Sequence, residues 1–457
     1  QRQRQDRRPE PGDRLDRRRR ANHEREEQEG LERRLGVDAP IIDGSSRLAT
    51  LAGADLRRIY RSPRANAGVS ARWPDPQRPL LALALALAAC GGTREQSAPP
   101  LEADALPAHL YASTRAAGIV SHLRADADFG DAMRYHFIDV GQGDATLLEF
   151  PCGAVLIDTG GEHNASFDSD KALTAYLDAF FDRRPDLGRT LDLVIITHPH
   201  IDHMRSVISV LERYKVRAVI DDGKTEAESE HDPGPEQQAR MHEWLAAHPE
   251  VAHQDIKVDD VGPLGLTSEL IDPVGACEAS RVDPRITVLW GAVTDEIASY
   301  GHDPNNHSLV VRVDYGKASA LFTGDLEIVG ISRLFAKYKD HPELFDVDIY
   351  QVGHHGSKNA TTHYQMEAMS PKLAVISMGP YERVHDWTAR KYGHPNLIAL
   401  EHLVHPKTGV TGWREQPVEA WVGIKGAWKD ERKEVFERRT ISKAIYATGW
   451  DGSVVVT

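Results

Sequence analysis

Cysteines and long apolar runs are both scarce in this chain. Only three cysteines occur among its 457 residues, Cys90, Cys152 and Cys277. Three are too few for a disulfide framework or for a cysteine-rich zinc module. No apolar run approaches the roughly 20 residues that a membrane-spanning helix needs. We therefore expect no transmembrane channel in this sequence.

Basic residues are also scarce outside the N-terminal part. Residues 1–68 contain 17 Arg, no Lys and 12 acidic residues, out of 55 basic and 69 acidic residues in the whole chain. The remaining residues therefore carry a clear excess of negative charge. Such an acidic body lacks the broad basic face that general DNA binding needs.

Residues 1–90 have the pattern of a leader rather than of a domain. Residues 1–68 are rich in Arg, Glu and Gln, which is typical of a disordered basic tail or of a nucleic-acid arm. We favour a third interpretation, in which 1–68 is a non-native upstream extension and translation starts at Val69. Residues 69–90 would then be a signal peptide with an apolar stretch at 80–89.

The stretch Leu87-Ala88-Ala89-Cys90 resembles the lipobox of bacterial lipoproteins. It predicts an extracytoplasmic protein that contacts the membrane only through a lipid anchor on Cys90. The alternative is a secreted or periplasmic protein. Residues 91–132 are small and polar at first, and we interpret them as a tether.

The chemistry of the chain is concentrated in residues 191–204, L-D-L-V-I-I-T-H-P-H-I-D-H-M. An apolar run typical of a buried strand ends in four potential metal ligands: His198, His200, Asp202 and His203. Side chains two apart on an extended segment point the same way, so His198 and His200 can hold one ion while the other two face a second. A surface loop that merely happens to be rich in His is the alternative. The spacing after a buried strand favours metals.

Hairpin geometry brings further candidate ligands to common edges. Residues 145–150 and 154–158 form one expected hairpin, which places Asp144 beside Asp158. Residues 308–313 and 318–322 form another, which places His307 beside Asp325. Further strands are expected at 135–140, 216–221, 266–274, 346–352 and 373–379, with helices near 171–184, 202–214 and 233–248 and another ending near 404.

Two stretches are interpreted as insertions, near 222–304 and 405–440. The first holds His231, His242, His248 and His253, which we interpret as ordinary surface histidines. The second holds Trp413, Trp421 and Trp428. These tryptophans are expected to pack the insertion onto the domain rather than to stack on bases or sugars.

The spacing H-x-H-x-D-H resembles the signature of the metallo-β-lactamase-fold hydrolases. The blocks D-V-G-Q-G-D-A, L-I-D-T-G, F-T-G-D, G-H-H-G-S and G-H-P stand in order along the chain. They resemble the hydrolase domain of ComEC-type competence proteins and their free-standing relatives, over residues 133–457. Residues 444–456 resemble the closing hairpin of that domain. The resemblance implies a four-layer αββα sandwich with the metals at one edge.

The resemblance also implies roles for single residues. His307 completes a first metal site with His198 and His200, and Asp325 bridges to a second site with Asp202, His203 and His355. Asp202 also orients the nucleophile, while His354 contacts the phosphate or donates a proton. The sequence alone does not separate His354 from His355. Supporting or substrate-edge positions are Asp139, Asp144, Asp158, Ser357 and His394.

The expected function is that of a metal-dependent hydrolase, in which two divalent ions supply a metal-bound hydroxide. Zinc suits these ligands best, and manganese or iron are alternatives. The expected substrate is a phosphodiester, either a nucleic acid or a small molecule. A lactonase or β-lactamase acting on a cyclic ester or amide is the alternative enzyme. A non-catalytic surface binding protein is the third candidate.

Overall fold

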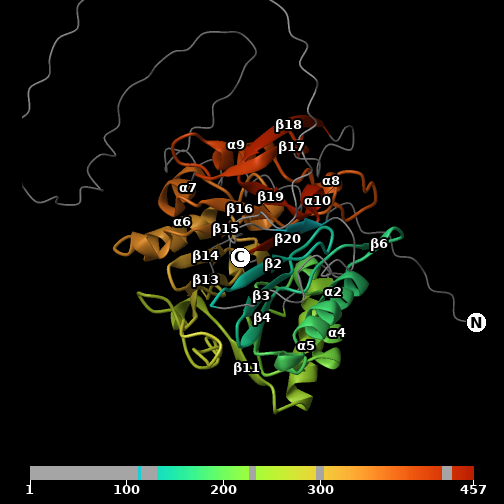
Figure 1. Cartoon of the computed structure of the whole chain (residues 1–457), viewed down its shortest axis with the longest axis vertical. Coiled ribbons are helices and arrows are strands. Elements are labelled where there is room, and N and C mark those ends of the chain that lie inside the picture. Colours follow the sequence, from blue (N-terminus) through green and yellow to red (C-terminus); the bar gives the residue numbers. More distant parts are fainter. Residues whose placement is uncertain (1–111, 115–130, 226–232, 295–302, 425–434) are drawn as a thin grey trace, which may run out of the picture. The chain divides into compact units, whose positions relative to one another are not determined.

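A computed structural model describes residues 112–114, 131–225, 233–294, 303–424 and 435–457 (Figure 1). The expectations for residues 1–68, for the signal peptide with Cys90 and for most of the tether lie outside the described residues, as do His231 and Trp428.

The first of two large sheets has eight strands. Their order is β1 (Ala112–Thr114), β20 (Ser453–Val456), β2 (Arg134–Phe137), β3 (Thr146–Phe150), β4 (Gly153–Ile157), β8 (Leu193–Ile195), β10 (Ala218–Asp221) and β11 (Ala252–Asp255). Pairing is antiparallel from β1 to β4 and parallel from β4 to β11. The expected hairpin at 145–158 is therefore present as β3 and β4.

The second sheet has six strands and is also mixed. Their order is β12 (Arg285–Trp290), β13 (Val310–Tyr315), β14 (Ala318–Phe322), β15 (Ile349–Gln351), β16 (Leu373–Ile376) and β19 (Ile445–Ala447). The strands β12 to β14 pair antiparallel, and β14 to β19 pair parallel. Parallel strands place their carboxyl ends at one edge, and this edge carries the candidate site.

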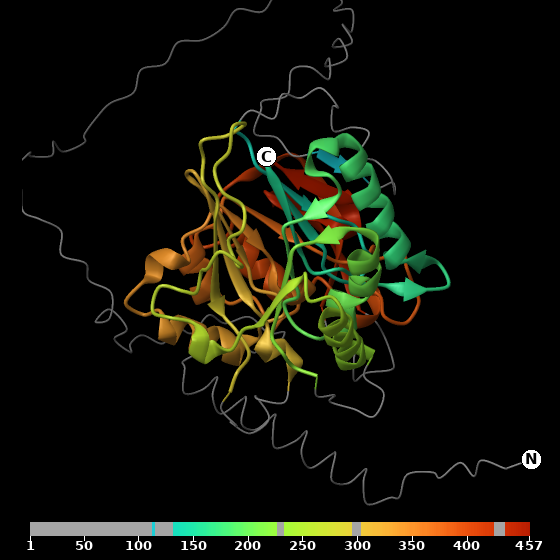
Figure 2. The same ribbon diagram turned by 90° about the horizontal axis from the view of Figure 1, so that it is seen from below.

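The apolar residues form two cores that match the layers. One core lies between the sheets, where Phe137 of β2 stacks on Phe322 of β14. The other lies between the first sheet and three helices, α2 (Ser169–Arg183), α4 (Val207–Arg213) and α5 (Pro233–Ala247). The helices α6 (Ile328–Lys337), α7 (His363–Met369) and α9 (Leu397–Val404) cover the second sheet (Figures 1 and 2). This arrangement confirms the αββα sandwich.

Shorter elements complete the fold. They are the strand pairs β5 (His163–Asn164) with β6 (Phe167–Asp168), β7 (Thr190–Leu191) with β9 (Lys215–Val216), and β17 (Trp413–Gly423) with β18 (Phe436–Lys443), and the short helices α3 (Ile201–Met204), α8 (Ala389–Tyr392) and α10 (Thr448–Asp451). In the β17–β18 ribbon, Trp421 stacks on Tyr381 of the main domain, as expected for packing. Trp413 instead is 67% exposed.

Three expectations for secondary structure are wrong. Residues 266–274 form no strand, because Leu266 makes one bridge to Val288 and Ser268 then turns the chain by accepting from Ile271 and Asp272. The continuous helix expected at 202–214 is split into α3 and α4, because Ser206 leaves the helical conformation with φ −95° and ψ 10°. The end of the chain resembled a closing hairpin, but β19 and β20 belong to different sheets. The helix α10 carries the chain from one sheet to the other.

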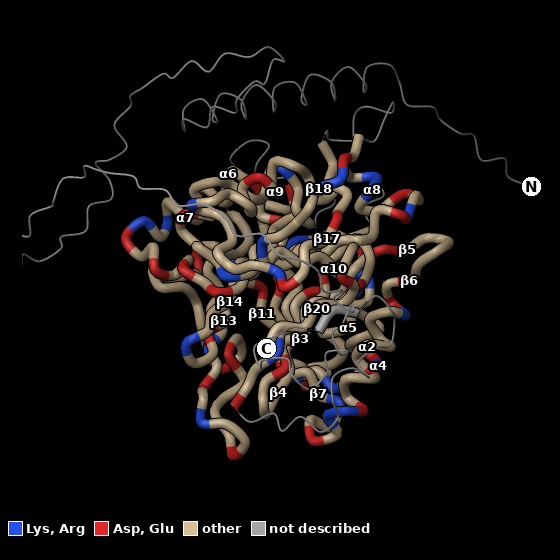
Figure 3. The backbone as a smooth tube through the Cα atoms, turned by 45° about the horizontal axis from the view of Figure 1, so that its top comes forward, with Lys and Arg blue, Asp and Glu red and all other residues tan. Residues whose placement is uncertain are grey.

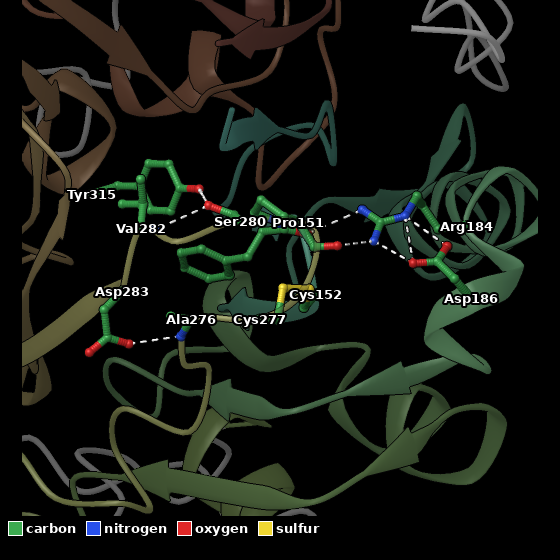
Figure 4. The surroundings of a disulfide bond; sticks show 11 residues. Pro151, Cys152, Arg184, Asp186, Ala276, Cys277, Ser280, Val282, Asp283 and Tyr315 are labelled. Atoms are coloured by element: carbon green, nitrogen blue, oxygen red, sulfur yellow. Dashed lines mark hydrogen bonds and ion pairs between the residues drawn. A yellow bond between two sulfur atoms is a disulfide. The ribbon is translucent and has the colours of Figure 1, made fainter. Parts of the chain in front are cut away.

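A disulfide joins Cys152, in the β3–β4 turn, to Cys277 in the first insertion, across 125 residues of sequence (Figure 4). The sequence did not predict this disulfide, because three cysteines allow several different pairs. The Cα atoms lie 6.4 Å apart, within the usual range. Arg184 anchors the same turn by donating to the carbonyl oxygen of Pro151 at 2.8 Å.

Among the described residues, no helix combines the length and the apolar character that crossing a bilayer requires.

Candidate metal centre

Residues 197–204, which we call the histidine turn, follow β8. The turns after β2 and after β4 hold this segment in place. The backbone N–H of Asp144 donates to the carbonyl oxygen of Asp202 at 3.0 Å, and that of Thr159 donates to the carbonyl oxygen of His203 at 2.6 Å. Gly143 has a positive φ of +145°, and a Cβ there would lie 2.3 Å from the Asp202 oxygen. The G-Q-G-D block therefore needs glycine to approach the histidine turn this closely.

One group of candidate ligands is His198, His200 and Asp325. The Nε2 atom of His198 lies 3.0 Å from Nδ1 of His200 and 4.0 Å from Oδ2 of Asp325. Two nitrogens bound to one tetrahedral zinc at about 2.0–2.1 Å lie roughly 3.3 Å apart. The two imidazoles are therefore spaced as ligands of a shared ion.

A second group contains His203, His355 and Asp325, with Asp144 behind them. The Nε2 atom of His203 lies 3.2 Å from Oδ1 of Asp325, and that of His355 lies 3.5 Å from Oδ2 of Asp325 and 3.2 Å from Oδ2 of Asp202. Asp325 thus belongs to both groups, as its expected bridging role requires.

The buried polar atoms of this group fit a metal. The Nε2 atoms of His203 and His355 and the Oδ1 atom of Asp325 have no hydrogen-bond partner among the described residues, although each is buried. Such atoms are costly unless something satisfies them. Each Nδ1 atom is engaged, since that of His203 donates to Asp158 at 2.8 Å and that of His355 donates to the Ser377 carbonyl at 2.9 Å. This fixes the tautomer that leaves Nε2 free for a cation.

Asp144 and Asp158 support the ligands from behind, at the common edge predicted for them. Oδ2 of Asp144 lies 3.8 Å from Nδ1 of His203 and 3.9 Å from Nδ1 of His355, on the side away from the free nitrogens. Its Oδ1 accepts from Gln351 at 2.7 Å. Gln351 ends β15 of the second sheet, so this hydrogen bond joins the two sheets at the site. The sequence analysis did not name Gln351. Its only mark in the sequence is that it is a polar residue in an otherwise apolar strand.

Charges in the centre depend strongly on one another. Burial alone would lower the pKa of His355, but Asp325, Asp202 and Asp144 outweigh it and raise this pKa to about 9. Burial raises the pKa of Asp144 to about 6, against the opposing effect of His355 and His203. Burial together with His203 and His200 holds the pKa of His198 well below its usual value. Without an ion, a pKa of about 9 would leave His355 protonated at neutral pH, and a bound cation would displace that proton, because neutral imidazoles and ionised carboxylates are the forms that bind metals.

His354 faces the same centre from a more exposed position. Its side chain is 20% exposed, and its Nε2 atom lies 3.7 Å from Oδ2 of Asp325. Its Nδ1 atom lies 3.5 Å from Oε1 of Glu327, and burial lowers its pKa. The ring of His394 lies 5.8 Å from that of His354, at the expected substrate edge. Glu327 was missed, because no motif marks it.

Seven predicted residues lie outside the two groups. Four of them, Asp202, Asp158, His354 and His394, still contact or face the centre, and the other three are His307, Asp139 and Ser357. His307 is buried nearby, but its Nδ1 atom accepts from the backbone N–H of Val293 at 2.9 Å, and the ligand group around His198 does not include it. Asp139 accepts from the backbone of Gly141 and shapes the turn before Asp144. The backbone N–H of Ser357 donates to the His354 carbonyl at 2.7 Å. A ligand role for His307 stays a prediction.

The sequence matches the profile of the metallo-beta-lactamase superfamily over residues 138–379. The chain belongs to this superfamily. It is 30% identical to ComE operon protein 3 of Bacillus subtilis (strain 168) over 281 residues, which are 58% of this chain and 30% of that protein. It is 26% identical to Recombination protein 2 of Haemophilus influenzae over 266 residues, 58% of this chain and 26% of that protein. The chain thus spans less than a third of either relative.

Among solved structures, the chain is similar to the metallo-beta-lactamase fold protein YhfI from Bacillus subtilis. The TM-score is 0.34 at 14% identity, over 61% of this chain and 93% of that one. The superfamily match and the competence-protein relatives confirm the resemblance read from the sequence motifs.

Proposed function

We propose that this protein is a metal-dependent hydrolase of phosphodiesters. The observation that carries the proposal is the sharing of Asp325 by two groups of buried ligands, with the Nε2 atoms of His203 and His355 left unsatisfied. Membership of a superfamily of hydrolases supports the reaction type. The name of one relative, Recombination protein 2, supports a nucleic-acid phosphodiester as the substrate class.

Two divalent ions held by these residues, with zinc preferred over manganese or iron, would supply an activated water and offset charge on a phosphoryl oxygen. Asp202 lies beside His355 and is positioned to orient that water. His354 faces the centre but lies outside both ligand groups, and its imidazolium form donates the Nε2 proton to the leaving oxygen and becomes a neutral imidazole. Oε1 of Glu327 lies 3.5 Å from Nδ1 of His354 without a hydrogen bond, so its contribution to His354 is an electrostatic one.

The surface charge bears on the kind of substrate. Figure 3 shows Lys and Arg scattered among Asp and Glu over the described part of the chain, without a continuous basic face in this view. Long duplexes are usually bound by such a face. We therefore propose a substrate that is recognised at the site itself, either a short or single strand or a small phosphodiester.

The test compares His354→Ala with His355→Ala on two leaving groups. His355→Ala should lose bound metal. His354→Ala should keep its metal and lose roughly 10²–10⁴-fold in turnover of a dinucleotide, but less with bis(p-nitrophenyl) phosphate, because nitrophenolate leaves without a proton. The control is His341→Ala, at a histidine that lies outside the metal centre and is 37% exposed.

If His354→Ala loses metal and His355→Ala does not, then His354 is the metal ligand and His355 is the proton donor. Cleavage of a lactam or a lactone, with no cleavage of any phosphodiester by the wild-type protein, would replace the substrate class with the alternative one. Absence of hydrolysis by the metal-loaded protein on all these substrates would favour the binding protein instead.

We also propose that the protein works outside the cytoplasm, attached through a lipid on Cys90. The disulfide between Cys152 and Cys277 supports this placement, because disulfides persist in oxidising compartments. Labelled fatty acid should be incorporated in the native host by the wild-type protein and by Cys277→Ser, but not by Cys90→Ala. Equal labelling of all three would refute the anchor.

A further inference from the structure

A second group of histidines lies away from the metal centre, in the first insertion. His242 of α5 and His253 of β11 converge on Asp221, the last residue of β10. The Nε2 atom of His242 lies 3.2 Å from both carboxylate oxygens of Asp221, and that of His253 lies 2.7 Å from its Oδ2. The sequence predicted ordinary surface histidines here, and the structure brings two of them together.

We propose that Asp221, His242 and His253 form a separate binding site for a divalent transition metal such as zinc. Both imidazoles approach through Nε2, and the two rings lie 5.1 Å apart at an angle of 47°. Two imidazole nitrogens and a carboxylate oxygen are a donor set typical of zinc, with a water in the fourth position. The three donor atoms lie within 4.8 Å of one another.

Burial and access both suit such a site. The Asp221 side chain is fully buried, whereas those of His242 and His253 are 26% and 29% exposed. An ion can therefore enter from solvent and reach a carboxylate that water does not screen. Asp222 is also buried, and its Oδ2 atom has no hydrogen-bond partner among the described residues. A cation here would offset negative charge on the adjacent carboxyl groups of Asp221 and Asp222.

The rest of the contacts show what the ion would hold in place. Gln238, one helical turn before His242, donates to Asp222 at 2.8 Å, so one face of α5 is directed at the end of β10. The beginning of the same helix supports the histidine turn. A Cβ on Gly234 would lie 1.8 Å from the Pro199 oxygen, and Gln237 donates to the carbonyl oxygen of Arg205 at 2.9 Å.

The helix α5 therefore links the two sites mechanically. Its first turn contacts both ends of the segment that carries His200, Asp202 and His203, and its middle is fixed to β10 and β11 by His242. A metal on Asp221, His242 and His253 would fasten this helix at the open edge of the sheet, where β11 is the outermost strand. The role assigned to this ion is structural, and it does not depend on the proposed hydrolase activity.

The test is metal stoichiometry of the full chain, loaded with Zn²⁺ and dialysed, for wild type, His242→Gln and His253→Gln. Each variant should hold about one zinc ion per chain fewer than wild type. Added Zn²⁺ should raise the melting temperature of the chelated wild type more than that of either variant. It should also slow hydrogen exchange in the middle of α5, around His242, more in the wild type than in His253→Gln. The matched control is His248→Gln, just beyond α5, whose Nδ1 atom binds the Trp244 carbonyl.

Zinc content and zinc-dependent melting that are the same in wild type and in both variants would overturn the proposal. The cluster would then be a set of hydrogen bonds centred on Asp221. The two substitutions are made separately at partly exposed positions, so one folded variant is enough to decide. The test compares zinc content between wild type and variants and does not use hydrolysis as a readout. It can therefore fail or succeed whether or not the proposed function is correct.

Discussion

Asp158 accepts a hydrogen bond from Nδ1 of His203 at 2.8 Å, which directs the opposite nitrogen of that imidazole at Asp325. Asp158 also accepts from the backbone N–H and the hydroxyl of Thr197, at 2.8 Å each. One carboxylate thus fixes both the strand end and the tautomer of a candidate ligand.

Replacing Asp158 with Asn should therefore weaken metal binding without unfolding the chain. The amide can donate to Nδ1, which favours the tautomer with a proton on Nε2 and blocks that nitrogen. We expect roughly 10–100-fold weaker affinity for the metal, measured by competition with a chelator. Asp182→Asn, at an 80% exposed side chain, is the control. An unchanged affinity would show that the contact between Asp158 and His203 does not tune the metal.

Gly143 and Gly188 provide a matched pair of glycine substitutions. Both have a positive φ, but a Cβ on Gly143 would lie 2.3 Å from the Asp202 oxygen, whereas the nearest atom to a Cβ on Gly188 is 4.0 Å away. Gly188→Ala should cost only the backbone strain, about 1 kcal/mol. Gly143→Ala should in addition displace the turn and reduce metal content. Equal metal content in both variants would contradict the tight contact.

The buried pair of His136 and Glu149 should make the protein sensitive to acid. Burial lowers the pKa of His136 below its usual 6.5, although Glu149 opposes this at 2.8 Å. The unfolded chain then binds a proton that the folded chain does not, so stability is complete above pH 6.5 and falls as the pH drops below it. The loss attributable to His136 should approach about 1.4 kcal/mol per pH unit.

His136→Gln is the variant that isolates this effect. The amide can keep a hydrogen bond to Glu149 but does not titrate. Urea unfolding at pH 7.5, 6.0 and 5.0 should show a shallower decline with pH for this variant than for wild type. Parallel declines would mean that other groups cause the acid sensitivity.

The disulfide between Cys152 and Cys277 should be a major contributor to stability. It closes a loop across 125 residues, and loops of this length give an estimated 2–5 kcal/mol by restricting the unfolded chain. Reducing agent should lower the melting temperature of wild type. It should have no further effect on a variant with Cys152→Ser and Cys277→Ser. A drop in the double variant as well would point to a different target of reduction.

The sequence by itself determined the fold and most of the candidate site. Hydrophobic periodicity marked the strands, and ligands at strand ends are predictable because hairpins and parallel strands bring their ends to known edges. The structure brings His198, His200, His203, Asp325 and His355 together, but the choice of His355 over His354 came from the family resemblance and not from the strand geometry.

Contacts between elements distant in sequence were decided only by the tertiary structure. Spacing along the chain does not report how two sheets pack, so Gln351 on Asp144, Glu327 beside His354 and the pairing of Cys152 with Cys277 were not foreseen. The same reason explains why β19 and β20 resembled a hairpin, since two adjacent strands in sequence can join different sheets. His242 and His253 became a candidate metal site only because β10, α5 and β11 bring them to Asp221.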